Sequence, residues 1–457
     1  MLNILRIKKG VLLAGDTLLL ILSLPAMLII SFREDFNFQI FVDHLFPFLF
    51  IYLFILILFY IGGLYDARSF KNSTYSFAAI LMFHAAGGIF GVLLFYLSSP
   101  EITPKTNLML NMAIAAALVI IWRGVFQRFL AQHIKINVAI AGNNEHAREL
   151  AHVISQQPYM GYNLSALINT NSDSLFTDHE HARVKTFFAD KNLVKNLRAA
   201  SIDTVITAEN PHLNPALAQA FYECIPYKIR FLDLAQSYEL LTGRIPVSYI
   251  NQTWFLENIN EAHKQLYASV KRFIDIIAAF AILILSLPFW IVIAFAIKWE
   301  SAGPIFYSQE RVGENKKLFK LTKFRSMIHN AEQGRAIWAQ AKDPRITKIG
   351  SFLRRTHLDE LPQMINIIKG DISLVGPRPE RIEFVQELEK QIPHYNIRHI
   401  IKPGFTGWAQ VNFGYARTPT DTYEKFQYDL YYLKNRSLIL DIATMLKTVN
   451  LIFKKDS

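Results

Sequence analysis

The stretch KRFIDIIAAFAILILSLPFWIVIAFAIKW (Lys271–Trp299) is apolar enough to enter a membrane, but Pro288 stands near its middle. A proline inside a helix removes a backbone hydrogen bond and clashes with the preceding turn, so it kinks or breaks the helix. Basic residues flank both ends, with Arg272 at the start and Lys298 at the end. Because a spanning helix would place one basic end outside, we predict a re-entrant helix over 271–299, broken at Pro288, with both ends in the cytoplasm. A plain spanning helix is the alternative.

The composition of the whole chain also indicates a membrane protein. Hydrophobic residues make up 52% of the 457 residues and charged residues only 19%, which is typical of membrane proteins. Lys and Arg number 48 against 37 Asp and Glu, and this excess of positive charge suits anionic partners such as lipid head groups or phosphates. The single cysteine, Cys224, excludes an internal disulfide and a cysteine-based zinc site.

Four apolar runs in the first third of the chain predict an N-terminal four-helix membrane bundle over 1–132. They are Val11–Phe32, Leu45–Leu64, Phe77–Leu97 and Leu108–Trp122. As helices, most are long enough to cross a hydrocarbon core of about 30 Å. The loops richer in Lys and Arg alternate, which places the N-terminus and everything after Lys135 in the cytoplasm. Asp16 and His84 lie inside runs, and we expect them to contact each other or the interface rather than form a transport path.

The segment 133–240 alternates between strand-like and helix-like patterns, beginning with the buried strand INVAIAG (Ile136–Gly142). Such alternation predicts a Rossmann-like, doubly wound α/β module. Its first turn lacks the G-x-G-x-x-G pattern, so a structural or regulatory role is favoured over a nucleotide or effector site, which stays open. A linker is predicted over 241–267, followed by an α-rich, membrane-associated catalytic domain over 268–457.

Two adjacent acids, Asp359 and Glu360, stand in RRTHLDELPQMINIIKGDISLVGPRPE (Arg354–Glu380). On a helix they point about 100° apart, so one can face substrate while the other reaches a metal. Nearby cations keep both ionised, and an ionised aspartate is a competent nucleophile towards phosphorus. A carboxylate with Mg²⁺ can screen a diphosphate. The pair alone is weak support, since adjacent acids also cap helices or solvate surfaces.

Several cations around the pair suit phosphate. Arg354 can clamp a phosphate bidentately, and Arg378 lies between two prolines that fix its backbone. Lys323 and Arg325 lie in a basic segment interleaved with aromatic residues, which favours a phosphate site over simple attraction to anionic lipid. Lys402, in IKPGFTGWAQ, lies either on a loop near phosphate or in a buried structural turn.

Taken together, the second half of the chain resembles the bacterial sugar transferase family, the initiating polyprenyl-phosphate sugar-1-phosphate transferases. The matching segments, in family order, are KRFIDI, GPIFYSQERVG, KLTKFRSM, LRRTHLDELPQMINIIKGDISLVGPRPE, IKPGFTGWAQVNFGYA and YDLYYLKNRSLILDI. The upstream plan of four membrane helices and a Rossmann-like module resembles the long-form members. One departure concerns the helix break, where some members carry Ser-Pro and this chain has Leu287-Pro288, so no serine hydrogen bond is expected there.

The resemblance implies roles for individual residues. Asp359 would form a covalent phospho-sugar intermediate, and Glu360 would support Mg²⁺, so that both acids are candidate metal ligands. The phosphate-handling cations would be Lys323, Arg325, Arg354 and Arg378. Glu380 and Lys402 are further candidate substrate-binding residues.

The implied function is transfer of sugar-1-phosphate from a UDP-sugar to undecaprenyl phosphate, with release of UMP. The donor is expected to be a neutral hexose, glucose or galactose, and the product to start exopolysaccharide, capsule or O-antigen synthesis. The protein would be a multi-pass protein of the bacterial inner membrane, in contact with membrane lipid and not with nucleic acid, and a homodimer is compatible with this plan. The alternatives are a non-catalytic scaffold of polysaccharide assembly, a membrane-anchored nucleotide-sugar epimerase or dehydrogenase, and direct transfer without a covalent intermediate.

Overall fold

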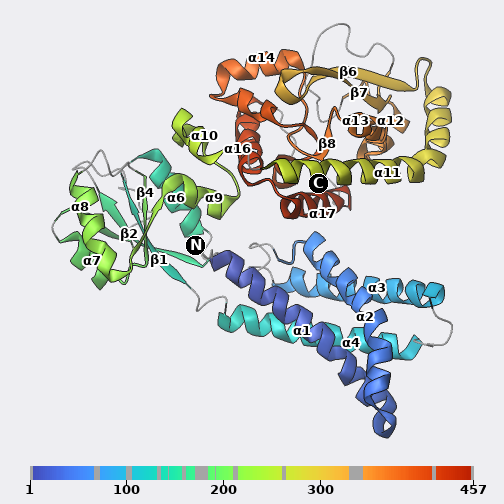
Figure 1. Ribbon diagram of the computed structural model, residues 1–457, viewed down its shortest axis with the longest axis horizontal. Coiled ribbons are helices and arrows are strands. Elements are labelled where there is room, and N and C mark those ends of the chain that lie inside the picture. Colours follow the sequence, from blue (N-terminus) through green and yellow to red (C-terminus); the bar gives the residue numbers. More distant parts are fainter. Residues whose placement is uncertain are drawn as a thin grey trace. The chain divides into compact units, whose positions relative to one another are not determined.

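The structure is a computed structural model, and its contacts divide the chain into two compact units, Met1–Leu241 and Thr242–Ser457 (Figure 1). The residues that it describes are 4–65, 73–98, 105–130, 135–142, 144–156, 161–169, 184–190, 192–208, 215–259, 264–328, 343–413 and 418–453.

The first unit begins with long apolar helices, each with the length and composition to cross a membrane. They are α1 (Ile4–Phe32), α2 (Phe38–Ile61), α3 (Ser73–Ser98) and α4 (Lys105–Val125), with short turns η1 (Arg33–Asp35) and η3 (Phe126–Leu130). Helix α1 packs against α2 and α4, and α3 packs against the same two helices. The prediction of apolar N-terminal helices is therefore confirmed, while their assembly as a bundle within a bilayer stays a prediction.

A buried ion pair joins α1 to α4. Arg123 donates to the Asp16 carboxylate at 2.5 Å, and the Tyr65 hydroxyl donates to the same carboxylate at 2.9 Å. His84 does not join this group and instead lies 2.8 Å from the carbonyl oxygen of Ile80 through Nδ1. Our expectation that Asp16 and His84 meet each other or the interface is therefore wrong for Asp16, because a buried carboxylate requires a cation as its partner.

The predicted doubly wound module is present as a five-stranded sheet in the order β3-β2-β1-β4-β5, with all neighbours parallel. Its strands are β1 (Ile136–Ala141), β2 (Tyr162–Asn169), β3 (Lys185–Phe188), β4 (Thr204–Thr207) and β5 (Arg230–Asp233). Its helices are α6 (Glu145–Gln156), α7 (Leu193–Ala199), α8 (Pro215–Cys224), η7 (Ile225–Tyr227) and α9 (Leu234–Thr242). The β4 strand is buried along its whole length, as expected for a parallel strand covered on both faces of its sheet.

The second unit contains the acid pair and is mainly helical, with two small sheets. Its strands are β6 (Phe306–Val312) and β7 (Leu318–Phe324), which form an antiparallel hairpin, and β8 (Ser373–Val375) and β9 (Gly404–Thr406), which pair in parallel. Its longer helices are α10 (Gln252–Asn258), α11 (Gln265–Glu300), α12 (Lys348–Arg355), α13 (Gln363–Lys369), α14 (Ile382–Gln391), α15 (Trp408–Asn412), α16 (Pro419–Asn435) and α17 (Leu438–Phe453). Short helical turns are η8 (Val247–Tyr249), η10 (Glu314–Lys316), η11 (Leu358–Glu360) and η12 (Tyr395–Ile400).

Within the segment 241–267, predicted as a linker, the described residues 242–259 pack into the second unit. Ile245, Val247 and Phe255 belong to one buried apolar cluster with residues of α13, α14 and α16. The backbone N–H of Ile245 also donates to the carbonyl oxygen of Gln427 at 3.1 Å. This segment therefore forms part of the core that supports the acid pair.

Helix α11 continues through Pro288 without interruption from Gln265 to Glu300. If straight, a helix of this length would extend about 54 Å, but Figure 1 shows its ribbon changing direction within its length. Pro288 lies in this helix and accounts for a bend, because its ring clashes with the preceding helical turn and its nitrogen cannot donate a hydrogen bond. Helix α11 is thus bent rather than broken.

The first half of α11 is tied to the second unit by two charged side chains. Arg272 donates to the carbonyl oxygens of Ile367 (2.5 Å) and Ile368 (2.7 Å), at the C-terminal end of α13. One turn further on, the buried Asp275 accepts a hydrogen bond of 2.7 Å from the Ser373 hydroxyl in β8. A cation at a helix C-terminus is also favoured by the helix dipole.

The end of α11 is tied to the same unit. Glu300 accepts hydrogen bonds from the backbone N–H groups of Lys348 (2.7 Å) and Ile349 (2.9 Å), so its carboxylate caps the N-terminus of α12. Arg325 donates to the carbonyl oxygens of Ser301 and Ala302, both at 2.7 Å, directly after the helix. Both ends of α11 are therefore held against one compact unit.

A serine hydrogen bond is present near the bend, contrary to our expectation from Leu287-Pro288. The Ser286 hydroxyl donates to the carbonyl oxygen of Leu283 at 3.0 Å and accepts from Trp290 Nε1 at 3.1 Å. The expectation was wrong because the serine stands two residues before the proline rather than next to it.

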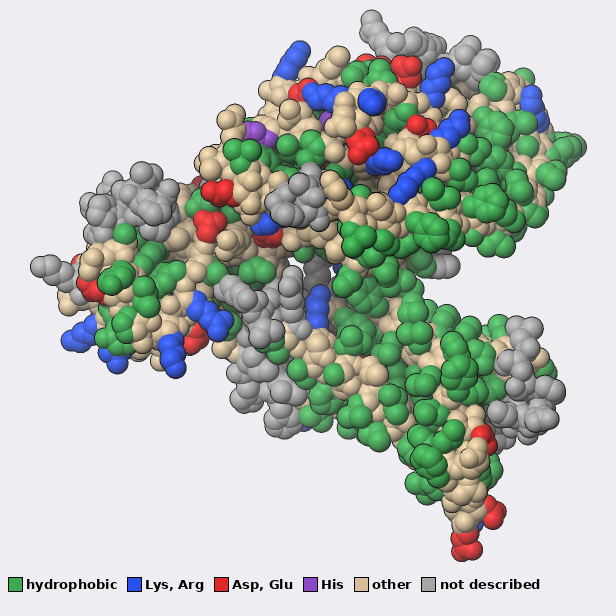
Figure 2. Space-filling view, viewed as in Figure 1, with side chains coloured by type: hydrophobic (Ala, Val, Ile, Leu, Met, Phe, Trp, Pro, Cys, Tyr) green, Lys and Arg blue, Asp and Glu red, His purple; other side chains and the backbone are tan. Residues whose placement is uncertain are grey.

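Most of the outer surface of α11 is apolar. Large apolar side chains of α11 between 66% and 80% exposed are Leu266, Phe273, Leu285, Ile291, Val292, Phe295 and Trp299. Figure 2 shows hydrophobic side chains gathered over the second half of this helix. Helix α17, which packs on β8 and β9, also exposes Ile439 and Ile442. Exposed apolar area of this size marks a surface for lipid or for another protein.

Candidate active site

The acid pair lies in a tight turn between two helices. After α12 ends, His357 has a φ of 56°, in the left-handed region, which non-glycine residues rarely adopt and which stores strain. This conformation redirects the chain into the short helix η11, where Asp359 and Glu360 are both buried. The carbonyl oxygen of His357 accepts the N–H of Glu360 at 3.2 Å. His357 therefore shapes the turn that carries the acid pair.

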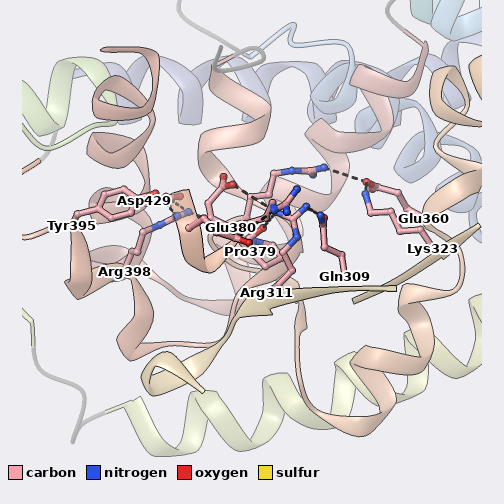
Figure 3. Close-up of polar contacts among 12 residues, drawn as sticks. Gln309, Arg311, Lys323, Glu360, Pro379, Glu380, Tyr395, Arg398 and Asp429 are labelled. Carbon is pink, nitrogen blue, oxygen red and sulfur yellow. Dashed lines mark hydrogen bonds and ion pairs between the residues drawn. The ribbon is translucent and has the colours of Figure 1, made fainter. Parts of the chain in front are cut away.

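Glu360 is ion-paired by two of the predicted cations (Figure 3). Its Oε1 atom lies 2.7 Å from Lys323 Nζ, on β7, and 3.3 Å from Arg378 Nη2. Burial raises the pKa of the Glu360 carboxyl, but the positive charges of Lys323 and Arg378 lower it by a larger amount. The pKa of Glu360 therefore lies well below its usual range. Glu360 is therefore ionised and fixed in place.

Asp359 differs from its neighbour, because none of the described residues donates a hydrogen bond to its carboxylate or forms an ion pair with it. Burial raises the pKa of Asp359, the charge of Lys323 lowers it and that of Glu360 raises it, with a net pKa above the usual value. Hydrogen bonds and ion pairs would stabilise the ionised form and weaken its attack. The arrangement thus leaves Asp359 with the more reactive carboxylate of the two.

The loop Pro377–Glu380 is clamped along its backbone. Its four consecutive carbonyl oxygens accept hydrogen bonds from four different donors: Gly404 N to Pro377 (2.8 Å), Arg398 Nη2 to Arg378 (2.9 Å), Arg311 Nη1 to Pro379 (3.4 Å) and Val312 N to Glu380 (3.0 Å). A backbone fixed at every carbonyl presents the Arg378 side chain, which is 40% exposed, from a rigid base.

One of these donors, Arg398, is itself held by a buried network. Its guanidinium lies 2.9 Å from Asp429 and donates to the Tyr395 hydroxyl at 2.7 Å, and Figure 3 shows these residues beside the loop. The side chains of Arg398 and Asp429 are 5% and 6% exposed. Removal of either residue from a charge pair this buried would leave the other charge uncompensated and would be strongly destabilising.

Comparison with known proteins identifies the family of this site. Residues 266–455 match the family model described as bacterial sugar transferase, and residues 60–217 match one described as CoA-binding domain. A UDP-glucose:undecaprenyl-phosphate glucose-1-phosphate transferase of Klebsiella pneumoniae is 30% identical over 85% of both chains. A protein with the same description from Xanthomonas campestris pv. campestris is 32% identical over 71% of this chain and 68% of its own.

The chain belongs to the bacterial sugar transferase family. The resemblance inferred from the motifs is therefore confirmed. A UDP-N-acetylgalactosamine-undecaprenyl-phosphate N-acetylgalactosaminephosphotransferase of Aeromonas hydrophila is more similar, at 42% identity, but the match spans 50% of this chain and only 53% of that relative.

In this sugar transferase, the predicted cations divide into two groups. Lys323 and Arg378 contact Glu360, and Arg354 lies close enough to lower the pKa of Asp359. Arg354 Nε also donates to the Ser326 hydroxyl at 2.8 Å. These three cations are the predicted residues that the fold brings to the acid pair.

The other predicted residues lie elsewhere. Arg325 directs its guanidinium at the end of α11, as described above, and Glu380 Oε2 lies 3.9 Å from Arg311 Nη1. The Lys402 ammonium lies beside Gly370 and Arg272, at the C-terminal end of α13, whereas the acid pair precedes its N-terminal end. Trp408 packs on the core and donates to the carbonyl oxygen of Gly243 at 2.9 Å, as expected for a structural turn.

Arg398 and Asp429 are the residues that sequence reasoning missed. Asp429 stands within the apolar helical pattern FQYDLYY (Phe426–Tyr432), and a buried acid requires a cation nearby. The pattern thus signals a buried charge, but it does not identify Arg398 as its partner.

Proposed function

We propose that this sugar transferase moves a sugar-1-phosphate from a UDP-sugar to undecaprenyl phosphate through a covalent phospho-sugar on Asp359. The observation that carries the proposal is the contrast within the acid pair. Glu360 is fixed by Lys323 and Arg378, whereas the buried Asp359 carboxylate receives no hydrogen bond from the described residues. The named relatives catalyse transfers of this type.

In the first half-reaction, a carboxylate oxygen of Asp359 attacks the phosphorus that bears the sugar. The new oxygen–phosphorus bond forms as the bond to the bridging oxygen breaks, and UMP leaves with that oxygen and its electron pair. No general base is needed, because the attacking carboxylate is already ionised. Lys323, Arg354 and Arg378 offset negative charge on the diphosphate, so their contribution is electrostatic and positional.

In the second half-reaction, a phosphate oxygen of undecaprenyl phosphate attacks the same phosphorus. The bond to the Asp359 oxygen breaks, the carboxylate is regenerated, and the sugar is joined to the lipid through a diphosphate. Two steps allow one aspartate to meet a soluble donor and a membrane-bound acceptor in turn.

Mg²⁺ is proposed as the cofactor. Among the described residues there is no cluster of three or more His, Cys, Asp or Glu that could hold a metal, but Mg²⁺ commonly uses one or two carboxylates together with substrate phosphates and water. Asp359 and Glu360 supply two such carboxylates, and both ion pairs of Glu360 involve only its Oε1 atom. When bound, Mg²⁺ would supply screening of the diphosphate charge.

We propose that α11 is a re-entrant membrane helix. Its ends are anchored to one compact unit by Arg272, Asp275 and Glu300, while large apolar side chains cover its outer surface. A helix that crossed the bilayer would have to separate these anchors by the membrane thickness. Placement in the bacterial inner membrane with the second unit on the cytoplasmic face follows from the distribution of Lys and Arg.

The donor sugar and pathway are finer proposals. We retain a neutral hexose, glucose or galactose, and a product that starts exopolysaccharide, capsule or O-antigen synthesis. The relatives named above act on glucose and N-acetylgalactosamine, and a Salmonella typhimurium relative is named a galactose phosphotransferase, so all three sugars belong in the test. A homodimer is likewise proposed and is tested by mass measurement in detergent.

The deciding experiment measures UMP release by the full-length protein with Mg²⁺, using UDP-glucose, UDP-galactose and UDP-N-acetylgalactosamine with and without undecaprenyl phosphate. Asp359→Asn should abolish release, whereas Glu387→Gln, an exposed carboxylate on α14, should not. Without lipid, mass spectrometry should find a phospho-sugar on the Asp359 peptide. Full release by Asp359→Asn would refute catalysis by this residue, and release without an adduct would favour direct transfer.

A further inference from the structure

Asn366 is a buried residue of α13 whose side-chain amide links this helix to strand β7. Its Nδ2 atom donates to the carbonyl oxygen of Lys320 at 2.8 Å, and its Oδ1 atom accepts the backbone N–H of Thr322 at 3.3 Å. The side chain is 3% exposed. In the described part of the chain, the hydrogen bonds between α13 and β7 all come from this amide. Asn366 therefore joins two elements that are separated in the sequence.

A third contact determines the orientation of the amide. Nδ2 also donates to Asp371 Oδ2 at 2.9 Å, just after the end of α13. A carboxylate accepts hydrogen bonds and an ammonium or amide nitrogen donates them, so the amide nitrogen faces Asp371 and the amide oxygen faces Thr322. Both N–H groups and the oxygen of Asn366 are therefore in use.

The amide binds the edge of β7 that does not pair with β6. These two strands form a sheet of their own, and a two-stranded hairpin alone is marginally stable. The N–H of Arg325 donates to Ile305, on the β6 side. By alternation, Leu321 also pairs towards β6, whereas Lys320 and Thr322 present their backbone groups to the opposite edge. There the Asn366 amide supplies one donor and one acceptor, as the peptide group of a third strand would.

The side chain that this link places is Lys323. Leu321 and Lys323 point to the same face of β7 because side chains alternate along a strand. Leu321 lies in the core of the second unit, and Lys323 Nζ lies 2.7 Å from Glu360 Oε1. Helix α13 begins at Gln363, three residues after Glu360. The amide of Asn366 and the ion pair therefore connect the same two pieces of structure.

We propose that Asn366 is a positioning residue that holds Lys323 in contact with Glu360. This inference rests on the proposed function, in which Lys323 offsets negative charge on the diphosphate. Asn366 acts through β7, since its own polar atoms are all used on Lys320, Thr322 and Asp371. A displacement of about 1 Å at a reacting site can lower the rate by about 100-fold, so the placement of β7 should affect transfer strongly.

The test compares Asn366→Leu, Lys323→Met and the double variant, in full-length protein with whichever of the three UDP-sugars supports UMP release. Asn366→Leu should lower kcat/KM by about 10- to 100-fold. In the Lys323→Met protein the same change should cost less than about 3-fold, because the side chain that it positions is absent. The control Ser308→Ala, which removes an exposed contact with Thr322 on the same hairpin, should match the unmodified protein.

Two outcomes of these kinetics would overturn the proposal. One is an unchanged kcat/KM in Asn366→Leu, and the other is a loss of equal factor with and without Lys323, as a general structural role would give. If Asn366→Leu does not fold, Asn366→Asp replaces it, because this variant keeps the shape and the acceptor for Thr322 but lacks both donors.

Chemical labelling of Lys323 keeps the test independent of turnover. An ammonium held in an ion pair stays protonated and reacts slowly with acetic anhydride. In Asn366→Leu, labelling of Lys323 should rise about 2- to 5-fold by mass spectrometry. Lys271, which lies 2.7 Å from Asp441, should react as before and thereby report an intact unit.

The labelling separates failure of this inference from failure of the proposed function. Absence of UMP release by the unmodified protein would refute the proposed function, whereas a rise in labelling at Lys323 alone would still support its placement by Asn366. Equal labelling of Lys323 in the two proteins, or an equal rise at Lys323 and Lys271, would overturn the inference.

Discussion

Replacement of Arg398 by methionine should destabilise the second unit more than any exposed substitution. The change removes the partner of Asp429, which is 6% exposed, together with the hydrogen bonds to Tyr395 and to the Arg378 carbonyl oxygen. A buried carboxylate left without its cation costs about 3–5 kcal/mol. For a unit of this size, about 2–4 °C of thermal midpoint is lost per kcal/mol, so we expect a decrease of about 6–20 °C.

Adding Asp429→Asn to Arg398→Met separates the effect of the unpaired Asp429 charge from the effect of the lost hydrogen bonds. It removes the unpaired carboxylate, so the double variant should unfold at a higher temperature than Arg398→Met alone, retaining only the loss of hydrogen bonds of about 1 kcal/mol each. Scanning fluorimetry of the full chain in detergent gives both midpoints. A double variant less stable than Arg398→Met would refute the reasoning, because the unpaired charge would not be the cause.

The pH dependence of the same variant has a defined sign. Burial raises the pKa of Asp429 in the folded protein even with Arg398 present. The contribution of this shift to the free energy of unfolding is therefore fully present below the pKa of the unfolded chain, and it is lost as pH rises through the pKa of the folded protein. Without Arg398 the folded pKa rises further. The decrease in thermal midpoint caused by Arg398→Met should therefore be smaller in mildly acidic buffer than in neutral buffer. An equal decrease in both buffers would show that the charge of Asp429 is not its cause.

Three further predictions concern the acid pair, the clamped loop and α11. Because the pKa of Asp359 is raised and its ionised form attacks in the proposed mechanism, kcat/KM should fall on the acid side at a higher pH than for an ordinary aspartate, and Lys323→Met should move this limb to still higher pH; an unmoved limb would assign it to another group. Gly404→Ala should cost about 1–3 kcal/mol in a thermal or denaturant assay, because a Cβ there meets the backbone of Gly376, whereas Gly124→Ala, where a Cβ meets nothing, should be tolerated. Cysteines introduced as Ser269→Cys and Lys298→Cys in a Cys224→Ser protein should both react with a membrane-impermeant maleimide from one side only, and labelling from opposite sides would establish a spanning helix.

Elements with a continuous or periodic pattern were predictable from the sequence. The long apolar helices and the parallel sheet follow from runs of apolar residues, because burial in lipid or between layers of helices dictates their side chains. The strand Lys185–Phe188 was missed, since its four residues are mostly exposed at the edge of the sheet and have no buried face to mark them. In the segment 241–267, predicted as a linker, Ile245, Val247 and Phe255 lie in the core, and the short turns between them leave no periodic pattern that would indicate their burial.

The candidate site was predictable only in part. The acid pair and Arg378 lie within one continuous motif, so their proximity is largely local. Lys323 and Arg325 lie two residues apart and carry the same charge, yet one contacts Glu360 and the other the end of α11. No local pattern distinguishes them, because the difference depends on where α11 ends in space.

Lys323 and Arg325 together limit the distance between the acid pair and the C-terminal end of α11. Lys323, near the end of β7, contacts Glu360, and Arg325, directly after β7, contacts Ser301 and Ala302, which directly follow α11. Two residues of extended chain span only about 7 Å. The strand therefore fixes the position of the acid pair relative to the C-terminal end of α11. If α11 lies in the bilayer and Asp359 reacts, as we propose, a shift of α11 along the membrane normal would move the Asp359 carboxylate by the same amount. The transfer rate should then depend on membrane thickness.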